Sequence, residues 1–142
     1  MKVLYTTEAT ATEGGRGVGQ SATHDGKVAV RLSTPKEMGG DGGPGTNPEQ
    51  LFATGYAACF LGAVHAAGRR SKVSVSMDAK VTAAVSFVDR EDGVGFSIAA
   101  ALTISIPGME RAQAEDLVAK AHQICPYSHA LTHALDVTLT VA

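Results

Sequence analysis

Apolar and polar residues alternate most regularly through the middle of the chain. The alternation runs without a break over residues 73–87 and again over residues 94–106, with the turn-forming stretch DREDG between the two runs. A period of two is that of a β-strand with one face buried and one exposed. The pattern therefore predicts a long antiparallel hairpin with one covered face.

Shorter alternating runs lie near both ends of the chain. Residues 3–9 and 28–32 predict two or three short strands, with a turn at Asp25-Gly26 between them. Residues 135–141 repeat the pattern and predict a last strand.

A long apolar segment follows a glycine-rich loop at residues 39–45. Asn47 is a preferred N-cap residue, Pro48 suits the first helical turn, and Gln50 completes a capping-box pattern. We expect a helix from about Pro48 to about Arg69. Its apolar residues nearly encircle it, which predicts burial in a core or against another subunit.

A second helix is predicted from about Glu110, where an apolar stripe recurs at helical spacing. Pro126 should stop this helix just beyond Cys125, because proline cannot continue a helix. Strands, helix, hairpin, helix and strand in this order predict an α+β fold with helices laid on a mostly antiparallel sheet. Residues 1–142 show no linker or repeat, which favours a single domain.

Composition narrows the function classes. The net charge is -2 and no run of lysine or arginine is present, so binding to nucleic acid or to an acidic lipid surface is not expected. The amino-terminal segment lacks the apolar core of a signal peptide. Nowhere does the chain reach the roughly eighteen uninterrupted apolar residues typical of a membrane span. We therefore expect a soluble, cytoplasmic protein.

Two cysteines, Cys59 and Cys125, stand far apart in the sequence. In a reducing compartment they are more typical of free, transient or catalytic thiols than of a permanent disulfide. Cys125 precedes a proline, where the chain can unwind and carry the sulfur several ångströms, as suits a resolving thiol. Arg16 lies among glycines and would hold Cys59 as a thiolate if the two met. Inert burial of both thiols remains the alternative.

Other candidate sites are weaker. GGRGVG at residues 14–19 does not open a helix and lacks the P-loop lysine, so a glycine-rich turn is favoured over a nucleotide site. Cys125, His129 and His133 recur every four residues, as metal ligands on a helix would. Pro126 and the lack of a fourth clear ligand argue against a metal site, and we expect none. The remaining histidines are interpreted as surface or structural residues.

Three motifs together resemble a known family. They are NPEQLFATGYAACF at residues 47–60, CPYS at 125–128 and ATEGGRGVG at 11–19. The chain resembles the organic hydroperoxide resistance (Ohr) branch of the OsmC-like proteins, which are bacterial thiol peroxidases, over its whole length. The resemblance implies an OsmC-like fold with antiparallel sheets packed on long central helices. It also implies an intertwined homodimer with two active sites at the subunit boundary.

The resemblance also implies roles for four residues. Cys59 would be the peroxidatic cysteine, Cys125 the resolving one, Arg16 the activating guanidinium, and Glu49 the carboxylate partner of that guanidinium. The substrate would be an organic hydroperoxide. The resulting disulfide would be reduced by an external lipoyl-type dithiol carried on another protein, with no cofactor bound to this chain.

The residues around Cys59 indicate a substrate preference, and the separation of Glu49 from Cys59 raises a geometric difficulty. Three aromatic side chains near Cys59 would favour apolar peroxides over hydrogen peroxide; they are Phe52, Tyr56 and Phe60. Glu49 and Cys59, however, are ten residues apart, about 15 Å along a straight helix, so one arginine cannot easily touch both. Either the helix bends or begins later, near Gly55, or Arg16 moves between its partners, or Arg16 comes from the other subunit.

Two other functions remain open. The apolar helix and the sheet could enclose a small hydrophobic ligand, with both cysteines inert. The chain could also be an OsmC-type peroxidase with another preference for substrate and reductant. Thiol chemistry with a peroxide separates the first alternative from a peroxidase, and the choice of reductant separates the second.

Overall fold

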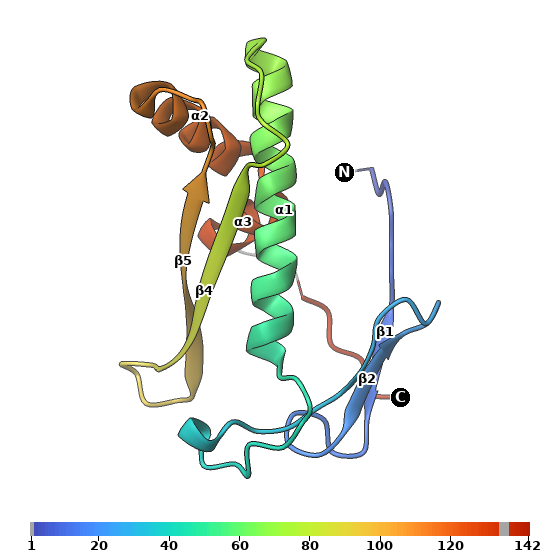
Figure 1. Cartoon of the computed structure of the whole chain (residues 1–142). Coiled ribbons are helices and arrows are strands. Elements are labelled where there is room, and N and C mark those ends of the chain that lie inside the picture. Colours follow the sequence, from blue (N-terminus) through green and yellow to red (C-terminus); the bar gives the residue numbers. More distant parts are fainter. Residues whose placement is uncertain (1, 134–136) are drawn as a thin grey trace. The chain divides into compact units, whose positions relative to one another are not determined.

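The computed structural model describes residues 2–133 and 137–142, arranged as two compact units. The first unit is Met1–Leu51 and the second is Phe52–Ala142. In chain order the elements are β1 (Ala9–Thr12), β2 (Gln20–Thr23), β3 (Ala29–Arg31), the 3-10 helix η1 (Lys36–Met38), α1 (Pro48–Ser71), β4 (Lys80–Asp89), β5 (Phe96–Ser105), α2 (Arg111–Ile124) and α3 (Pro126–Thr132) (Figure 1).

The first unit contains a small antiparallel sheet in the order β1-β2-β3. Ala9 pairs with Thr23 at one end of the β1–β2 ladder, and Ser21 pairs with Val30 in the β2–β3 ladder. The connection from β2 to β3 turns at Gly26, whose positive φ of 72° favours glycine. The predicted turn at Asp25-Gly26 and the predicted strand within residues 28–32 are therefore confirmed.

The predicted strand over residues 3–9 is wrong in its position. β1 begins only at Ala9, and residues 2–8 have no regular structure. The apolar side chains of Val3, Leu4 and Tyr5 are exposed. The reason is the length of the partner strand: β2 ends at Thr23, opposite Ala9, and beyond it the described ladder adds only one bond, from the His24 N–H to the Glu8 carbonyl.

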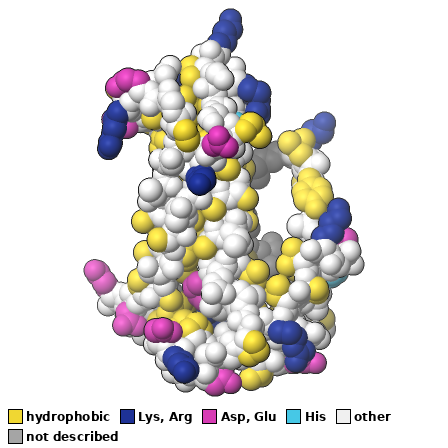
Figure 2. Space-filling model, viewed as in Figure 1, with side chains coloured by type: hydrophobic (Ala, Val, Ile, Leu, Met, Phe, Trp, Pro, Cys, Tyr) yellow, Lys and Arg dark blue, Asp and Glu magenta, His cyan; other side chains and the backbone are white. Residues whose placement is uncertain are grey.

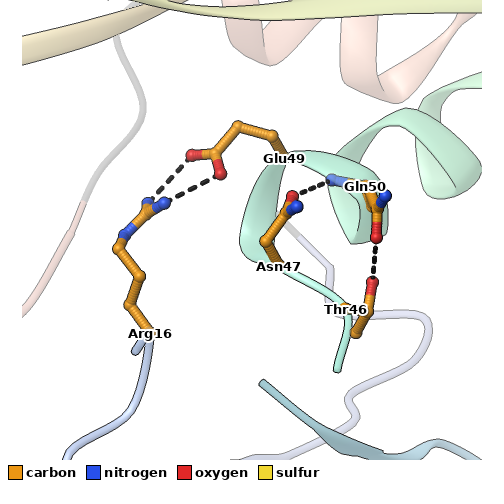
Figure 3. Close-up of polar contacts among 5 residues, drawn as sticks. All are labelled: Arg16, Thr46, Asn47, Glu49 and Gln50. Carbon is orange, nitrogen blue, oxygen red and sulfur yellow. Dashed lines mark hydrogen bonds and ion pairs between the residues drawn. The ribbon is translucent and has the colours of Figure 1, made fainter. Parts of the chain in front are cut away.

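Helix α1 begins as predicted. The Asn47 side chain accepts a hydrogen bond from the Gln50 backbone N–H at 2.8 Å, which caps the helix. The Gln50 side chain bonds to Thr46 instead of completing the predicted capping box (Figure 3). The helix is continuous from Pro48 to Ser71, so a start near Gly55 is wrong.

Strands β4 and β5 form the predicted long hairpin. Their register runs from Lys80 opposite Ser105 to Asp89 opposite Phe96. Residues 73–79, predicted as part of the first strand, form turns and irregular chain instead. They have no partner because the opposite strand ends at Ser105, and Val75 packs beside Gly68 of α1, where a Cβ would approach it to 2.7 Å.

The core of the second unit confirms that α1 is buried on much of its surface. Residues of α1 and α2 and one cysteine form the core cluster; they are Tyr56, Phe60, Ala63, Val64, Ala67, Leu117, Ala121 and Cys125. Val81 and Leu102 of the hairpin pack against this cluster. By length and composition alone α1 could cross a membrane, but its buried residues make it a core helix of this unit.

One part of the hairpin surface is not covered by the residues that the structure describes. Phe96 is 61% exposed and Ile98 37% exposed, although both belong to the apolar set of the alternating pattern. Figure 2 shows hydrophobic side chains open to solvent at intervals along the surface of this unit. The predicted covered face is thus covered only in part.

The carboxyl-terminal part differs from the prediction in two ways. Helix α2 ends at Ile124, as the position of Pro126 predicts, but a further short helix, α3, begins at Pro126 itself. Proline is favoured in the first turn of a helix because it has no N–H to leave unpaired. The last strand is also wrong for residues 137–142, which are irregular and exposed, since the described residues supply no strand to pair with them; Leu135 lies outside the described residues.

With these corrections the α+β class is confirmed, with antiparallel sheets and a long central helix. The single-domain organisation stays a prediction.

Candidate functional site

The two cysteines meet in the second unit. The Sγ atoms of Cys59 and Cys125 lie 3.7 Å apart, although the residues are 66 positions apart in the sequence. Both are free thiols; Cys59 is half-buried on α1, and Cys125 is buried. A disulfide bond is about 2.05 Å long, so the sulfurs need to approach by about 1.7 Å. This is less than the movement of several ångströms expected from the sequence.

Pro126 places Cys125 at a corner between two helices. A residue before proline is driven away from helical backbone angles, and Cys125 has φ -70° and ψ 123°. Its N–H still donates to Ala121 in α2, and its carbonyl accepts from His129 in α3, each at 2.9 Å. Cys125 therefore ends one helix and precedes the next, with its backbone held on both sides.

The surroundings of Cys59 within the second unit favour the protonated thiol. Burial is the largest cause that raises its pKa, and the neighbouring Cys125 sulfur raises it further. The backbone N–H of Tyr127 acts in the opposite direction by donating to the Cys59 sulfur. The balance is a raised pKa, which favours the neutral thiol over the thiolate.

Aromatic rings pack around the thiol pair. The ring of Tyr56 lies 6.0 Å from Phe52, 6.3 Å from Phe60 and 5.8 Å from Tyr127, measured between centroids. Tyr56 and Phe60 are only 4% and 2% exposed, so they belong to the core. Tyr127 completes the group, although sequence reasoning did not select it; its place two residues after Cys125 was the available signal.

A buried hydrogen bond joins α1 to α3 beside the thiols. The hydroxyl groups of Tyr56 and Ser128 lie 2.8 Å apart, and either can be the donor. Ser128 is completely buried. No sequence pattern indicates that these two residues pair, because they are 72 positions apart.

The first unit holds a charged pair. The guanidinium of Arg16 donates two hydrogen bonds to the carboxylate of Glu49, at 2.8 and 2.9 Å (Figure 3). This two-bond geometry is the strong form of an arginine–carboxylate contact. The bond from Arg16 is the main reason why the pKa of Glu49 is lowered, and the bond to Glu49 raises the pKa of Arg16.

The backbone geometry of the turn explains why glycines surround Arg16. Gly14 and Gly15 have positive φ values of 89° and 68°, which side-chain-bearing residues rarely adopt. A Cβ on Gly19 would lie 2.2 Å from the carbonyl oxygen of Thr12. The stretch is therefore a tight turn between β1 and β2, as predicted.

The predicted site residues thus fall into two pairs, one in each unit. Cys59 pairs with Cys125, and Arg16 pairs with Glu49. The catalytic roles of these four residues, including an approach of Arg16 to Cys59, stay predictions.

The predicted absence of a metal site concerns mainly His129 and His133. Their rings stack on each other with centroids 4.1 Å apart, while Cys125 is buried against Cys59. Across residues 2–133 and 137–142, no group of three or more histidine, cysteine or acidic side chains is arranged to hold a metal ion.

Comparison with known proteins gives one consistent family. The OsmC-like protein family matches residues 39–140. The organic hydroperoxide resistance protein of Xanthomonas axonopodis pv. citri (strain 306) is 50% identical over 141 residues, covering 99% of this chain and 96% of the relative.

Comparison with solved structures gives the same family. An organic hydroperoxide resistance protein from Elizabethkingia anophelis has a TM-score of 0.86 at 40% identity, covering 94% of this chain and 93% of that one. A putative organic hydroperoxide resistance protein from Vibrio cholerae, with captopril bound in one of its active sites, has a TM-score of 0.83 at 45% identity. That comparison covers 96% of this chain and 90% of the other. Both match in fold over almost the whole chain.

Proposed function

This chain belongs to the OsmC-like protein family, and we propose that it is a thiol peroxidase that reduces organic hydroperoxides to alcohols. The observation that carries the proposal is the 3.7 Å separation of the Cys59 and Cys125 sulfurs. Two free thiols so close together can pass through a sulfenic acid and a disulfide with little movement of the chain. The names of the relatives support the substrate class.

In the first step, the Cys59 thiolate attacks the terminal oxygen of the hydroperoxide. The O–O bond breaks, a new S–O bond forms, and the alkoxide takes a proton and leaves as the alcohol. Cys59 becomes a sulfenic acid. Cys59 is assigned the attack because it is the half-buried thiol, whereas Cys125 is completely buried.

In the second step, Cys125 attacks the sulfur of the Cys59 sulfenic acid. The S–O bond breaks, the Cys59–Cys125 disulfide forms, and water leaves. The disulfide prevents further oxidation of Cys59 by excess peroxide. It must then be reduced by an external dithiol before the next turnover.

We assign the activation of Cys59 to Arg16. The groups of the second unit leave the pKa of Cys59 raised, and a nearby guanidinium would lower it and stabilise the charge that develops on the leaving alkoxide. Glu49 would hold the guanidinium in place between turnovers through its two hydrogen bonds. Since α1 is continuous between Glu49 and Cys59, three alternatives stay open: the helix bends, Arg16 moves between its two partners, or Arg16 serves Cys59 of a second subunit.

Phe52 is only partly buried and Tyr127 is 38% exposed, so these two rings offer an apolar surface that favours an alkyl or fatty acid hydroperoxide over hydrogen peroxide; Tyr56 and Phe60 are almost fully buried in the core. An apolar wall binds the hydrocarbon part of such a substrate and offers nothing to a small polar peroxide. We propose a lipoyl-type dithiol, carried on another protein, as the reductant, and a cytoplasmic location for the cycle.

We propose further that the working form is an intertwined homodimer. Residues 3–7 and 137–142 keep the alternating strand pattern but lie exposed and without a paired strand, and Phe96 on the hairpin is exposed as well. A second copy would supply both the missing strand partners and the cover for the apolar surface.

A hydrophobic-ligand binding module with inert cysteines is the alternative outside enzymology. It would not explain why two free thiols lie so close together. An OsmC-type peroxidase with another substrate and reductant preference is the alternative within the family.

The assignment of the two thiols predicts different defects for two variants. Cys59→Ser should abolish hydroperoxide consumption in a folded protein. Cys125→Ser should keep the first turnover, accumulate a sulfenic acid that dimedone traps, and then inactivate as excess peroxide oxidises Cys59 irreversibly. Peptide mapping of peroxide-treated wild type under non-reducing conditions should yield a Cys59–Cys125 cross-link. Its absence would show that Cys125 is not the resolving thiol.

The assignment of Arg16 predicts a change in the pH dependence of Cys59. Arg16→Ala should raise the pKa of Cys59, move its alkylation profile to higher pH, and slow hydroperoxide consumption at neutral pH by about 10²-fold or more. Arg31→Ala is the matched control, because Arg31 pairs with Glu13 on the exposed surface of the same unit. An alkylation profile that is unchanged in Arg16→Ala would place the activating charge elsewhere.

The homodimer predicts a mass in solution of twice the 14.5 kDa of one chain, measured by sedimentation or light scattering. Leu139→Glu should weaken the dimer, since Leu139 lies in the exposed terminal run. Thr140→Glu, at the alternate position of the same run, should do so much less. A wild-type protein that stays monomeric at micromolar concentration contradicts the proposal.

The proposal of a lipoyl-type reductant predicts that the steady-state turnover rate depends on which dithiol is supplied. With an alkyl hydroperoxide as substrate, reduced lipoyl dithiol should sustain turnover at least about tenfold faster than thioredoxin at equal concentration. Equal or reversed rates would favour the alternative peroxidase within the family.

A further inference from the structure

We propose that the buried hydrogen bond between Tyr56 and Ser128 positions Cys125 for disulfide formation and has no part in the attack on the peroxide. The inference rests on the proposed two-thiol cycle and adds two positioning residues to it. Tyr56 precedes Cys59 by three residues on α1, and Ser128 follows Cys125 by three residues on α3. The bond therefore joins the two segments that carry the thiols, about one helical turn from each sulfur.

The Tyr56–Ser128 hydrogen bond is short and almost completely shielded from solvent. The two hydroxyl oxygens are 2.8 Å apart, Ser128 has no exposed surface, and Tyr56 is only 4% exposed. Buried hydroxyl groups that lose their partner pay a desolvation penalty, since no water replaces it. A rotation or slide of α3 against α1 would separate both groups at once, so the bond fixes the register of the two helices.

The aromatic packing beside the bond cannot fix that register alone. The ring of Tyr127 packs on Tyr56 and Phe52, with centroids 5.8 Å from each. Gly55 makes room for it, because a Cβ there would lie 2.9 Å from the Tyr127 hydroxyl. Ring contacts tolerate small shifts, whereas a hydrogen bond is lost when its two atoms separate by an ångström. The aromatic rings hold α3 near α1, and the Tyr56–Ser128 bond sets its exact position.

Disulfide formation is the step that needs this precision. The sulfurs are 3.7 Å apart and must reach about 2.05 Å with a narrow range of dihedral angles. Cys125 lies at the corner between α2 and α3, so a displacement of the first turn of α3 displaces its sulfur. A misplacement of about 1 Å can slow an intramolecular reaction about 10²-fold. The attack on peroxide uses Cys59 and does not require Cys125.

The test separates the two chemical steps in single-turnover experiments with the full chain. Ser128→Ala should oxidise Cys59 to the sulfenic acid at nearly the wild-type rate and form the disulfide about tenfold more slowly. Slower resolution leaves the sulfenic acid open to a second peroxide. The hydroperoxide concentration that converts half of the chains to sulfinic acid should therefore fall by the same factor of about ten.

Thr132→Val is the matched control. Thr132 also carries a hydroxyl on α3, but that hydroxyl donates to the Ser128 backbone carbonyl within the same helix. Its loss should leave the rate of disulfide formation and the peroxide tolerance at wild-type values. A merely structural contribution of Ser128 would lower the stability without changing the ratio of the two step rates.

A second variant protects the test against misfolding. Tyr56→Phe removes the same bond from the other side and keeps the buried ring, so it should slow disulfide formation in the same direction. If wild type forms no disulfide at all, the proposed two-thiol cycle itself fails. If wild type forms it and the folded variants among Ser128→Ala and Tyr56→Phe form it equally fast, the positioning role is wrong while the proposed function stands.

Discussion

The backbone restriction that Pro126 places on Cys125 determines the arrangement around both thiols. A residue before proline avoids helical angles, so α2 must end at Ile124 and a new helix must begin at Pro126. The corner directs the Cys125 sulfur to within 3.7 Å of Cys59. It also presents the Tyr127 N–H to the Cys59 sulfur and the Ser128 hydroxyl to Tyr56. The corner at Pro126 thus brings Cys125, Tyr127 and Ser128 of the CPYS motif against Cys59 and Tyr56 of α1.

Burial of the two thiols has two opposing effects on the proposed chemistry. Burial keeps the two sulfurs close and away from water, but it also raises the pKa of Cys59, and a protonated thiol is a poor nucleophile. The first unit contains a guanidinium that a carboxylate holds by two hydrogen bonds, and the tight glycine turn presents it. We propose that this charge offsets the effect of burial. The exposed strand-like residues at both ends of the chain are the basis of our proposal that the site is completed in a homodimer.

The sequence predicted those features whose causes are local. The cap at Asn47 and the break at Pro126 act through neighbouring residues, and the period of the hairpin follows from its own alternation. The wrong strand predictions have one common cause: alternation over residues 3–7, 73–79 and 137–142 describes a strand without saying which strand will pair with it. The short helix α3 was missed because seven residues carry too little pattern. Proximity between Cys59 and Cys125, or between Tyr56 and Ser128, depends on the folded chain and has no signal in the spacing of residues.

The central claim is that Cys59 and Cys125 act as one redox pair, and the mass of the intact chain tests it most directly. Reduced protein is treated with one equivalent of an alkyl hydroperoxide, and its mass is measured before and after, together with the alcohol released. The account predicts that each chain loses two hydrogen atoms while one molecule of alcohol forms, because the peroxide oxygen leaves as alcohol and water. An unchanged mass, or a stable gain of oxygen without loss of hydrogen, would contradict it.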